Sequence, residues 1–547
     1  MDDEATNPAM STFARDEDRR VVPRWRFLSD RMPDAELRGD PRLKIVRDYD
    51  PTYLAQRVYD WEQAPGLATA ADLVTGAWAA GDRAKAVDAA EYLLKNRTLL
   101  MGGVADLAER YLGRRTAGST SPAGHQRALL LPPDFTSRSR ATVRAARERI
   151  SRNARNAEAW LDMSRAYAIM GQKERSERAM ARALIVAPHH RMVLRAAARL
   201  YVHLHDADRA AKLLSQHPRT RVDPWLLASE IAIASITDKT SKHIRAARSM
   251  VALKGLPPAH LAELHSALAT VDYDRGEMRY ARRHARESLV APNDNCVAQA
   301  RWLAVRHPEI VVTNAAFDLA QSYEARCWRS LREGDWNRAI TESQGWLLDE
   351  PYSSRPALIG SFIAVTLTED YLFGEACARI GIQADPASRP LRNNLAVALA
   401  YLGKQTDAEQ QYRLIAKRFD NDFPEYVYQA TGGLLQFRAG DVPAGRVHYN
   451  RAMGLAPDSM RTRVLAYWIR EELHFSPGVA AEALSFCDKA LVLSKRDPFT
   501  MRLVQLVRAQ AERASNLMAQ LPGSSHSVRS RLEASPMMPI VKPPNEF

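Results

Sequence analysis

Cysteine is scarce in this sequence. Its 547 residues include four cysteines, and the closest two, Cys296 and Cys327, are 31 residues apart. A disulfide-dense secreted scaffold needs more cysteines, and the common zinc sites need closely spaced pairs. Both classes are therefore excluded, and we expect four reduced thiols, most of them buried.

Aromatic residues and long apolar runs are also scarce. Aromatics make up 7% of the chain, which argues against β-sandwiches and barrels, whose strands favour aromatic and β-branched side chains. Ala, Leu, Arg and Glu dominate many windows and favour helices. No window offers the roughly 18 uninterrupted apolar residues of a membrane span, and no signal peptide or lipid anchor is visible. We expect a soluble, cytoplasmic, all-α protein.

Catalytic motifs are missing as well. The sequence has no phosphate-binding loop, dinucleotide-binding glycine pattern, zinc-protease helix, nucleophile elbow or EF-hand loop. Two close histidine pairs, His189 with His190 and His203 with His205, have no cluster of cysteines or carboxylates to complete a metal shell. We therefore expect no enzyme activity, no cofactor and no metal.

The pattern that is present begins at Trp160. Large side chains at helical spacing are followed by a glycine that permits a turn, then by small side chains that let a second helix approach, then by a proline that ends the unit. These residues are Trp160, Met163, Tyr167, Gly171, Ser176, Ala183 and Pro188. A shift of 34 residues reaches a similar series: Leu194, Ala197, Ala198, Tyr201, Ala210 and Leu214.

This spacing resembles the tetratricopeptide repeat family of helical-hairpin proteins. About ten units of varying fidelity cover most of residues 66 to 498. The resemblance implies a right-handed α-solenoid of helix-turn-helix repeats with disordered termini. It predicts six segments: a disordered tail over 1–40, a small helical module over 41–112, a linker over 113–137, a superhelix over 138–498, a capping helix over 499–520 and a disordered tail over 521–547.

The resemblance also implies a concave groove lined by the first helix of each unit, where partners bind. In the early units the groove positions are Arg165, Arg195, Arg199 and His203. Such a positive patch suits an acidic segment. Alternatively, these arginines pair with Asp162, Glu158 or Glu230 of the same chain.

In the later units the same positions are mostly apolar. They are Ile359, Ile363, Asn393, Val397, Tyr401, Leu434, Phe437 and Trp468. Soluble proteins rarely leave such a stripe in water, so a partner helix, a second subunit or the chain's own tail should cover it. Alternatively, tight superhelical winding buries the stripe.

Basic residues exceed acidic ones, 77 to 64, for a net charge of +13. Seven arginines lie between Arg138 and Arg155, distributed around a helix, and a second set forms one stripe at Arg275, Arg279, Arg282 and Arg286. Arginines on a solvated surface explain both segments, and an anionic partner is the alternative.

The repeats favour a non-catalytic adaptor that holds a peptide or helix of another protein in the groove, with self-association as a further use. Two alternatives stay open. One is a basic regulatory protein that associates with nucleic acid, which steep salt dependence of binding would reveal. The other is a subunit of an enzyme complex, with any chemistry in residues 1–137.

Overall fold

A computed structural model describes residues 22–26, 51–80, 84–96, 108, 111–112, 134–253, 256–319, 321–415, 419–420, 423–494 and 497–520. The chain divides into two compact units, which we call the first unit (Asp16–Ala325) and the second unit (the part that includes Arg326–Phe547). The division falls inside the range predicted as one superhelix. The segments predicted as linker and C-terminal tail lie almost wholly outside the described residues, as does most of the N-terminal tail.

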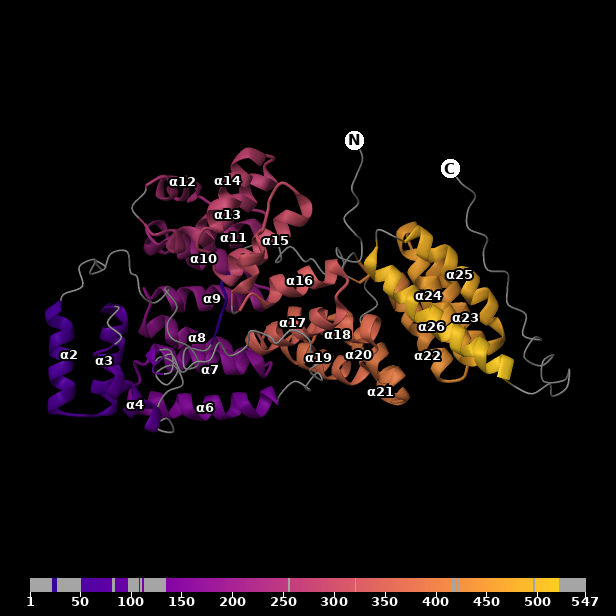
Figure 1. Cartoon of the computed structure of the whole chain (residues 1–547), viewed down its shortest axis with the longest axis horizontal. Coiled ribbons are helices and arrows are strands. Elements are labelled where there is room, and N and C mark those ends of the chain that lie inside the picture. Colours follow the sequence, from indigo (N-terminus) through magenta and orange to yellow (C-terminus); the bar gives the residue numbers. More distant parts are fainter. Residues whose placement is uncertain are drawn as a thin grey trace. The chain divides into compact units, whose positions relative to one another are not determined.

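Helices make up most of the described part of the first unit (Figure 1). They are α2 (Pro51–Gln63), α3 (Leu67–Ala80), α4 (Val87–Lys95), α6 (Phe135–Arg152), α7 (Ala157–Ile169), α8 (Lys173–Val186), α9 (Arg191–His203), α10 (Ala207–Gln216), η3 (Pro218–Arg221), α11 (Pro224–Ile236), α12 (Ile244–Ala252), α13 (Pro258–Asp274), α14 (Met278–Ser288), α15 (Asp294–Arg306), η4 (Asn314–Asp318) and the start of α16 (Tyr323–Glu333).

The second unit continues in the same way. Its elements are the remainder of α16, α17 (Trp336–Asp349), α18 (Ser354–Ile363), η5 (Ala364–Thr368), α19 (Tyr371–Ala384), α20 (Arg389–Tyr401), α21 (Gln405–Arg413), α22 (Glu425–Arg438), α23 (Val442–Leu455), α24 (Asp458–Phe475), η6 (Pro477–Val479), α25 (Ala480–Leu493) and α26 (Pro498–Gln520). No strand occurs among the described residues, where one isolated β-bridge joins Asp420 and Phe423. The predicted all-α fold of helical hairpins is confirmed for the described residues.

A left-handed residue marks the turn inside each regular hairpin. Glycine takes this conformation at Gly171, Gly276, Gly334, Gly403 and Gly440, and non-glycine residues take it at His205, Asp238 and Glu369. The next N–H along the chain donates to a carbonyl further back in the first helix, as Gln172 does to Tyr167 at 2.8 Å. This Schellman geometry ends the first helix and starts the second in a fixed direction.

Small side chains sit where the two helices of a hairpin meet. Ser176 and Ala183 of α8 are fully buried, and the serine hydroxyls of Ser164 and Ser176 lie 3.1 Å apart across the α7–α8 contact. Alanines at the equivalent places of later hairpins, such as Ala339 and Ala408, are also fully buried. The small residues of the predicted pattern therefore lie between the paired helices, as expected, and allow them to pack closely.

The four cysteines lie inside the helical layers. All four are buried and carry free thiols. Burial raises the pKa of the Cys296 and Cys377 thiols, so both stay protonated and unreactive at neutral pH. The prediction of reduced, buried thiols is confirmed.

Two glycines of α23 allow a direct test of this packing. A Cβ added at Gly445 would lie 2.5 Å from the Phe437 ring, whereas one added at Gly454 would meet nothing within 4 Å. We expect Gly445→Ala to destabilise the second unit by about 1–3 kcal/mol through overpacking. The matched change Gly454→Ala should stabilise it by roughly 0.5–1 kcal/mol, because alanine favours a helix. Thermal unfolding followed by circular dichroism measures both; equal shifts would contradict the close α22–α23 contact.

Candidate functional site

The first helices of successive hairpins, α7, α9, α11, α13 and α15, form one wall in the first unit. Their side chains keep a common register, since Arg195 of α9, Ser229 of α11 and Glu263 of α13 follow one another at 34-residue intervals. Arg195 Nη1 lies 2.6 Å from Glu263 Oε2 and 3.5 Å from Ser229 Oγ. We use the word groove for the side of these helices on which Arg195, Ser229 and Glu263 lie.

A short piece of the chain's own N-terminal region lies in this groove. Residues 22–26 form a non-helical segment with the sequence Val-Pro-Arg-Trp-Arg, which we call the N-terminal segment. Its Val22, Pro23 and Trp25 are buried, and Trp25 keeps only 4% of its surface exposed. The segment is thus packed into the first unit, within the range that the sequence predicted as a disordered tail.

The groove holds the main chain of the segment at both ends. Arg165 Nε on α7 donates to the Trp25 carbonyl at 2.8 Å, and Asn295 Nδ2 on α15 donates to the Val22 carbonyl at 3.0 Å. Both donors are buried. Because these bonds reach carbonyl oxygens, they do not depend on which side chains the segment carries.

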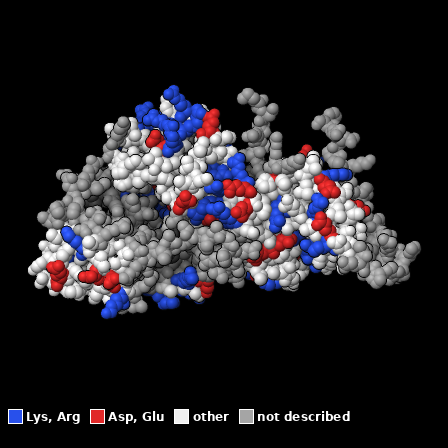
Figure 2. Space-filling view, in the orientation of Figure 1, with Lys and Arg blue, Asp and Glu red and all other residues white. Residues whose placement is uncertain are grey.

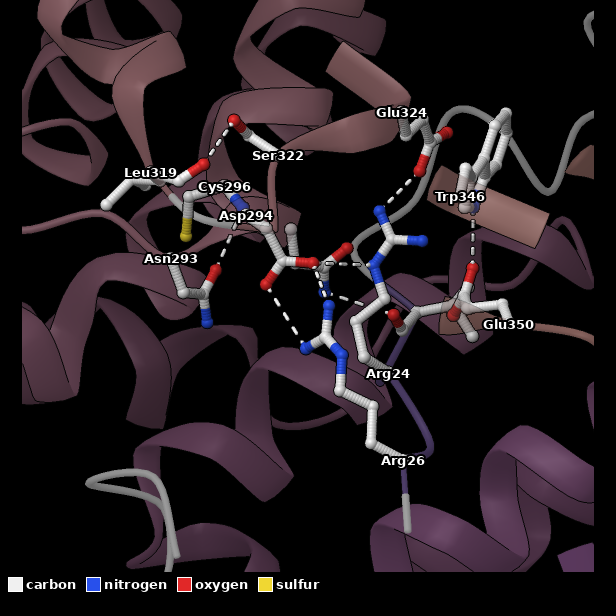
Figure 3. Close-up of polar contacts among 12 residues, drawn as sticks. Arg24, Arg26, Asn293, Asp294, Cys296, Leu319, Ser322, Glu324, Trp346 and Glu350 are labelled. Carbon is white, nitrogen blue, oxygen red and sulfur yellow. Dashed lines mark hydrogen bonds and ion pairs between the residues drawn. The ribbon is translucent and has the colours of Figure 1, made fainter. Parts of the chain in front are cut away.

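Two carboxylates hold the arginines of the segment (Figure 3). Asp294 accepts from Arg26 through both carboxylate oxygens and lies 3.4 Å from Arg24 Nε. Glu324, at the start of α16, accepts from Arg24 Nη2. All four side chains are 10–14% exposed. Charge-assisted hydrogen bonds in so little water are stronger than surface ion pairs.

A buried ion pair forms the floor of the groove. Arg195 donates to both oxygens of Glu263, at 2.6 and 3.1 Å, and to the Trp225 carbonyl at 3.2 Å. Asn293 Nδ2 donates to the same carboxylate at 2.8 Å, and Asn295 lies within 3.5 Å of it. Asn295 therefore connects the ion pair to the bound main chain.

The four groove residues predicted in the early units behave differently from one another. Arg165 contacts the bound segment, and Arg199 is buried one helical turn beyond Arg195. Arg195 forms an ion pair with Glu263, so the prediction that it belongs to a positive patch for an acidic ligand is wrong. Burial, with Arg199 and His205 nearby, lowers the pKa of His203 to about 3, which leaves it neutral at pH 7.

The alternative was that these arginines pair with acids of the same chain. Arg195 does so, but with an acid that was not among those predicted. Of the predicted acids, Asp162 pairs with Arg149 at 2.7 Å, and Glu230 accepts from the Ser241 hydroxyl. The acid that meets Arg195 is Glu263, two hairpins further along the chain.

The predicted residues of the later units are buried to different degrees in the second unit. Ile359, Ile363, Asn393, Leu434 and Phe437 are buried, whereas Val397, Tyr401 and Trp468 are half-buried. Asn393, Val397, Tyr401 and Leu434 line an apolar cavity of about 180 Å³, to which α26 contributes Phe499 and Leu503. Trp468 stacks on Tyr449 and donates to Glu472 at 2.9 Å. Helices of the same unit cover part of this stripe, and coverage of the rest by a partner stays a prediction.

Sequence reasoning missed the residues that matter most in the groove. These are Arg24, Trp25, Arg26, Glu263, Asp294, Asn295 and Glu324. One usable signal was the run Val21 to Leu28, whose apolar and basic residues differ from the polar residues around it. Another was the 34-residue register that places Glu263 in line with Arg195.

Three residues of the predicted arginine stripe, Arg279, Arg282 and Arg286, lie on α14, and Arg275 lies at the end of α13. All four are exposed, and Figure 2 shows Lys and Arg gathered over α14. Arg282 forms an ion pair with Glu309. On α6, Arg147, Arg149 and Arg152 contact Tyr167, Asp162 and Glu148.

Among the residues that the structure describes, no group of three or more His, Cys, Asp or Glu side chains is arranged to hold a metal ion. None of the described helices combines the length and the apolar character needed to cross a membrane.

Comparison with known proteins gives likeness in fold alone. No described protein family and no curated protein matches the chain. The Cut9–Hcn1 hetero-tetramer of the APC/C is 13% identical over 83% of this chain and 93% of that chain, with a TM-score of 0.35. The human IFIT1 dimer with PPP-AAAA is 14% identical over 89% and 99%, with a TM-score of 0.28. Yeast Tom70 is 12% identical over 86% and 99%, with a TM-score of 0.27.

The buried ion pair predicts a large effect of removing one charge. Glu263→Gln leaves the Arg195 guanidinium buried without a counter-charge, so we expect a loss of about 3 kcal/mol in the free energy of unfolding of the first unit. The matched change Glu177→Gln breaks the surface pair with Arg209 and should cost less than about 1 kcal/mol. Urea unfolding of both variants measures the difference, and a Glu263→Gln effect as small as the control would refute the pair's role.

Proposed function

We propose that this protein is a non-catalytic adaptor that binds a non-helical segment of another protein in the groove of the first unit. The observation that supports this proposal is the N-terminal segment itself, whose main chain is already held there by Arg165 and Asn295. A groove that accommodates one short segment through its carbonyls has the shape and donors to accommodate another.

The donors are suited to this task because the surrounding helices position them. Asn295 lies beside the Arg195–Glu263 pair, and Arg165 lies on α7, which packs against α9, the helix that carries Arg195. A hydrogen bond from a charged donor such as Arg165 contributes about 1.5–3 kcal/mol, more than one between neutral groups. Donors fixed in this way lose little conformational entropy when a partner binds.

The proposal is tested with a chain whose own segment no longer fills the groove. We define the opened variant as the full chain with Arg24→Ala, Trp25→Ala and Arg26→Ala. A phage library of 12-residue peptides is selected on the opened variant and on the same variant with Arg165→Ala and Asn295→Ala. We expect the recovered peptides to bind the opened variant at least about tenfold tighter, because the second protein lacks both main-chain donors.

A matched control carries Arg182→Ala, an exposed residue of α8, in the opened variant. Its peptide binding should equal that of the opened variant itself. Recovered peptides that bind with the same affinity whether or not Arg165 and Asn295 are present would overturn the proposed function.

A second candidate function is association with nucleic acid, and the exposed arginine stripe on α14 is the observation that favours it. Under this function, a 20-nucleotide RNA would bind the chain with an affinity that falls at least about tenfold between 50 and 200 mM salt. Arg279→Glu with Arg286→Glu would abolish that binding, measured by fluorescence anisotropy. Binding unchanged by these two substitutions would exclude the stripe as the RNA site.

A further inference from the structure

The carboxylates at one end of the groove carry information about the partner that the main-chain donors do not. We propose that the partner segment is basic, with two arginines separated by one large apolar residue, and that the N-terminal segment is this chain's own copy of that motif. This inference rests on the proposed function and adds the chemistry of the ligand to it.

The negative charge of the site favours a basic segment. Asp294 and Glu324 are buried with the N-terminal segment in place, and both accept hydrogen bonds from its arginines. With the segment in place, the two carboxylates face its arginines with little access to water. A replacement segment without positive charge would cover them again without these ion pairs, which is costly, and an acidic segment would be repelled.

The two arginines of the segment are two residues apart, and this spacing matches the site. Arg24 and Arg26 both reach Asp294 although one residue separates them. In an extended strand, residues two apart project to the same side and neighbours to opposite sides, and a segment that follows this alternation presents both arginines to Asp294. Two arginines at positions i and i+2 therefore match the contacts of the N-terminal segment, and we expect two adjacent arginines to match them less well.

The shape of the guanidinium favours arginine over lysine at the second basic position. Arg26 Nη1 and Nη2 face the two different oxygens of Asp294. This two-pronged contact requires the planar fork of a guanidinium, and the single ammonium of lysine offers no equivalent. The site should therefore prefer arginine to lysine at the second basic position.

The residue between the arginines completes the motif. Trp25 is buried while its carbonyl accepts from Arg165, so the groove surrounds a large side chain at that position. An aromatic residue buries a large apolar area on binding, which favours a partner with such a residue between its two arginines.

The tethered segment must also compete with any partner. A ligand joined to its own site acts at an effective concentration in the millimolar range when the connection is short. A free peptide of the same sequence should therefore bind the opened variant at least about tenfold tighter than the unmodified chain.

The experiment measures this competition directly. The probe is a fluorescein-labelled peptide with the sequence of residues 20–28, and binding is followed by fluorescence anisotropy with the full-length opened variant and the unmodified chain. We expect the tenfold difference given above. Equal affinity for the two proteins would overturn the assignment of the N-terminal segment as the competing copy.

A peptide series tests the chemistry of the ligand on the opened variant. We expect the peptide with Arg24→Gln and Arg26→Gln to bind at least about tenfold more weakly than the parent, and the peptide with Arg26→Lys to fall between them. A peptide with Arg24 and Trp25 exchanged, which makes the two arginines adjacent, should also lose affinity. Equal binding of the parent and glutamine peptides would overturn the basic motif while the proposed main-chain function stands.

Substitutions in the groove give the reciprocal test. In the opened variant with Asp294→Asn and Glu324→Gln, the parent and glutamine peptides should bind alike. Asp208→Asn, which breaks the exposed pair with Lys239, is the matched control and should keep the full preference. Circular dichroism checks folding, and the peptide series decides the question by itself if the groove variant does not fold. Failure of every peptide to bind a folded opened variant would reject the proposed function together with this inference.

Discussion

The ion pair between Arg195 and Glu263 is the interaction on which the groove depends. A guanidinium on the inner helices of a repeat array is too costly to bury alone, and a carboxylate two hairpins away offsets that cost through two hydrogen bonds. The same carboxylate accepts from Asn293 and lies beside Asn295. Asn295 is thereby positioned to hold a main-chain carbonyl, so the charge balance of the wall and the recognition of the segment come from one network.

Much of the fold could be predicted because its signal is local. Small residues such as Ser176 and Ala183 recur at a fixed interval, and each needs only its own hairpin to be interpreted. Three hairpin turns were harder to recognise, because His205, Asp238 and Glu369 take the left-handed conformation that usually signals glycine. The groove depends on distant pairs instead. Only the 34-residue register relates Glu263 to Arg195, and nothing near Arg24 in the sequence identifies Glu324, because these pairs form between helices and segments that are distant in the chain.

The inner surfaces of the two units differ in polarity. In the second unit the inner positions are mostly apolar, and α24 and α26 contribute Tyr467, Phe499 and Leu503 to the cavity that these positions line. An apolar surface can be buried by any apolar neighbour, so the chain's own helices can cover part of it. In the first unit the inner positions are polar and need specific partners. Such a surface can remain available for exchange between one segment and another.

The division of contacts in the groove separates affinity from selectivity. Arg165 and Asn295 bind carbonyl oxygens, which every segment has, so they would hold a wide range of chains with similar strength. Asp294 and Glu324 bind side chains, so they distinguish one segment from another. Because the carboxylates come from α15 and α16 and the arginine donor from α7, a segment must extend across the row of helices to satisfy both sets. A partner that matches only one end would lose to the tethered segment, which matches both, and this competition would sharpen the selectivity that the carboxylates provide.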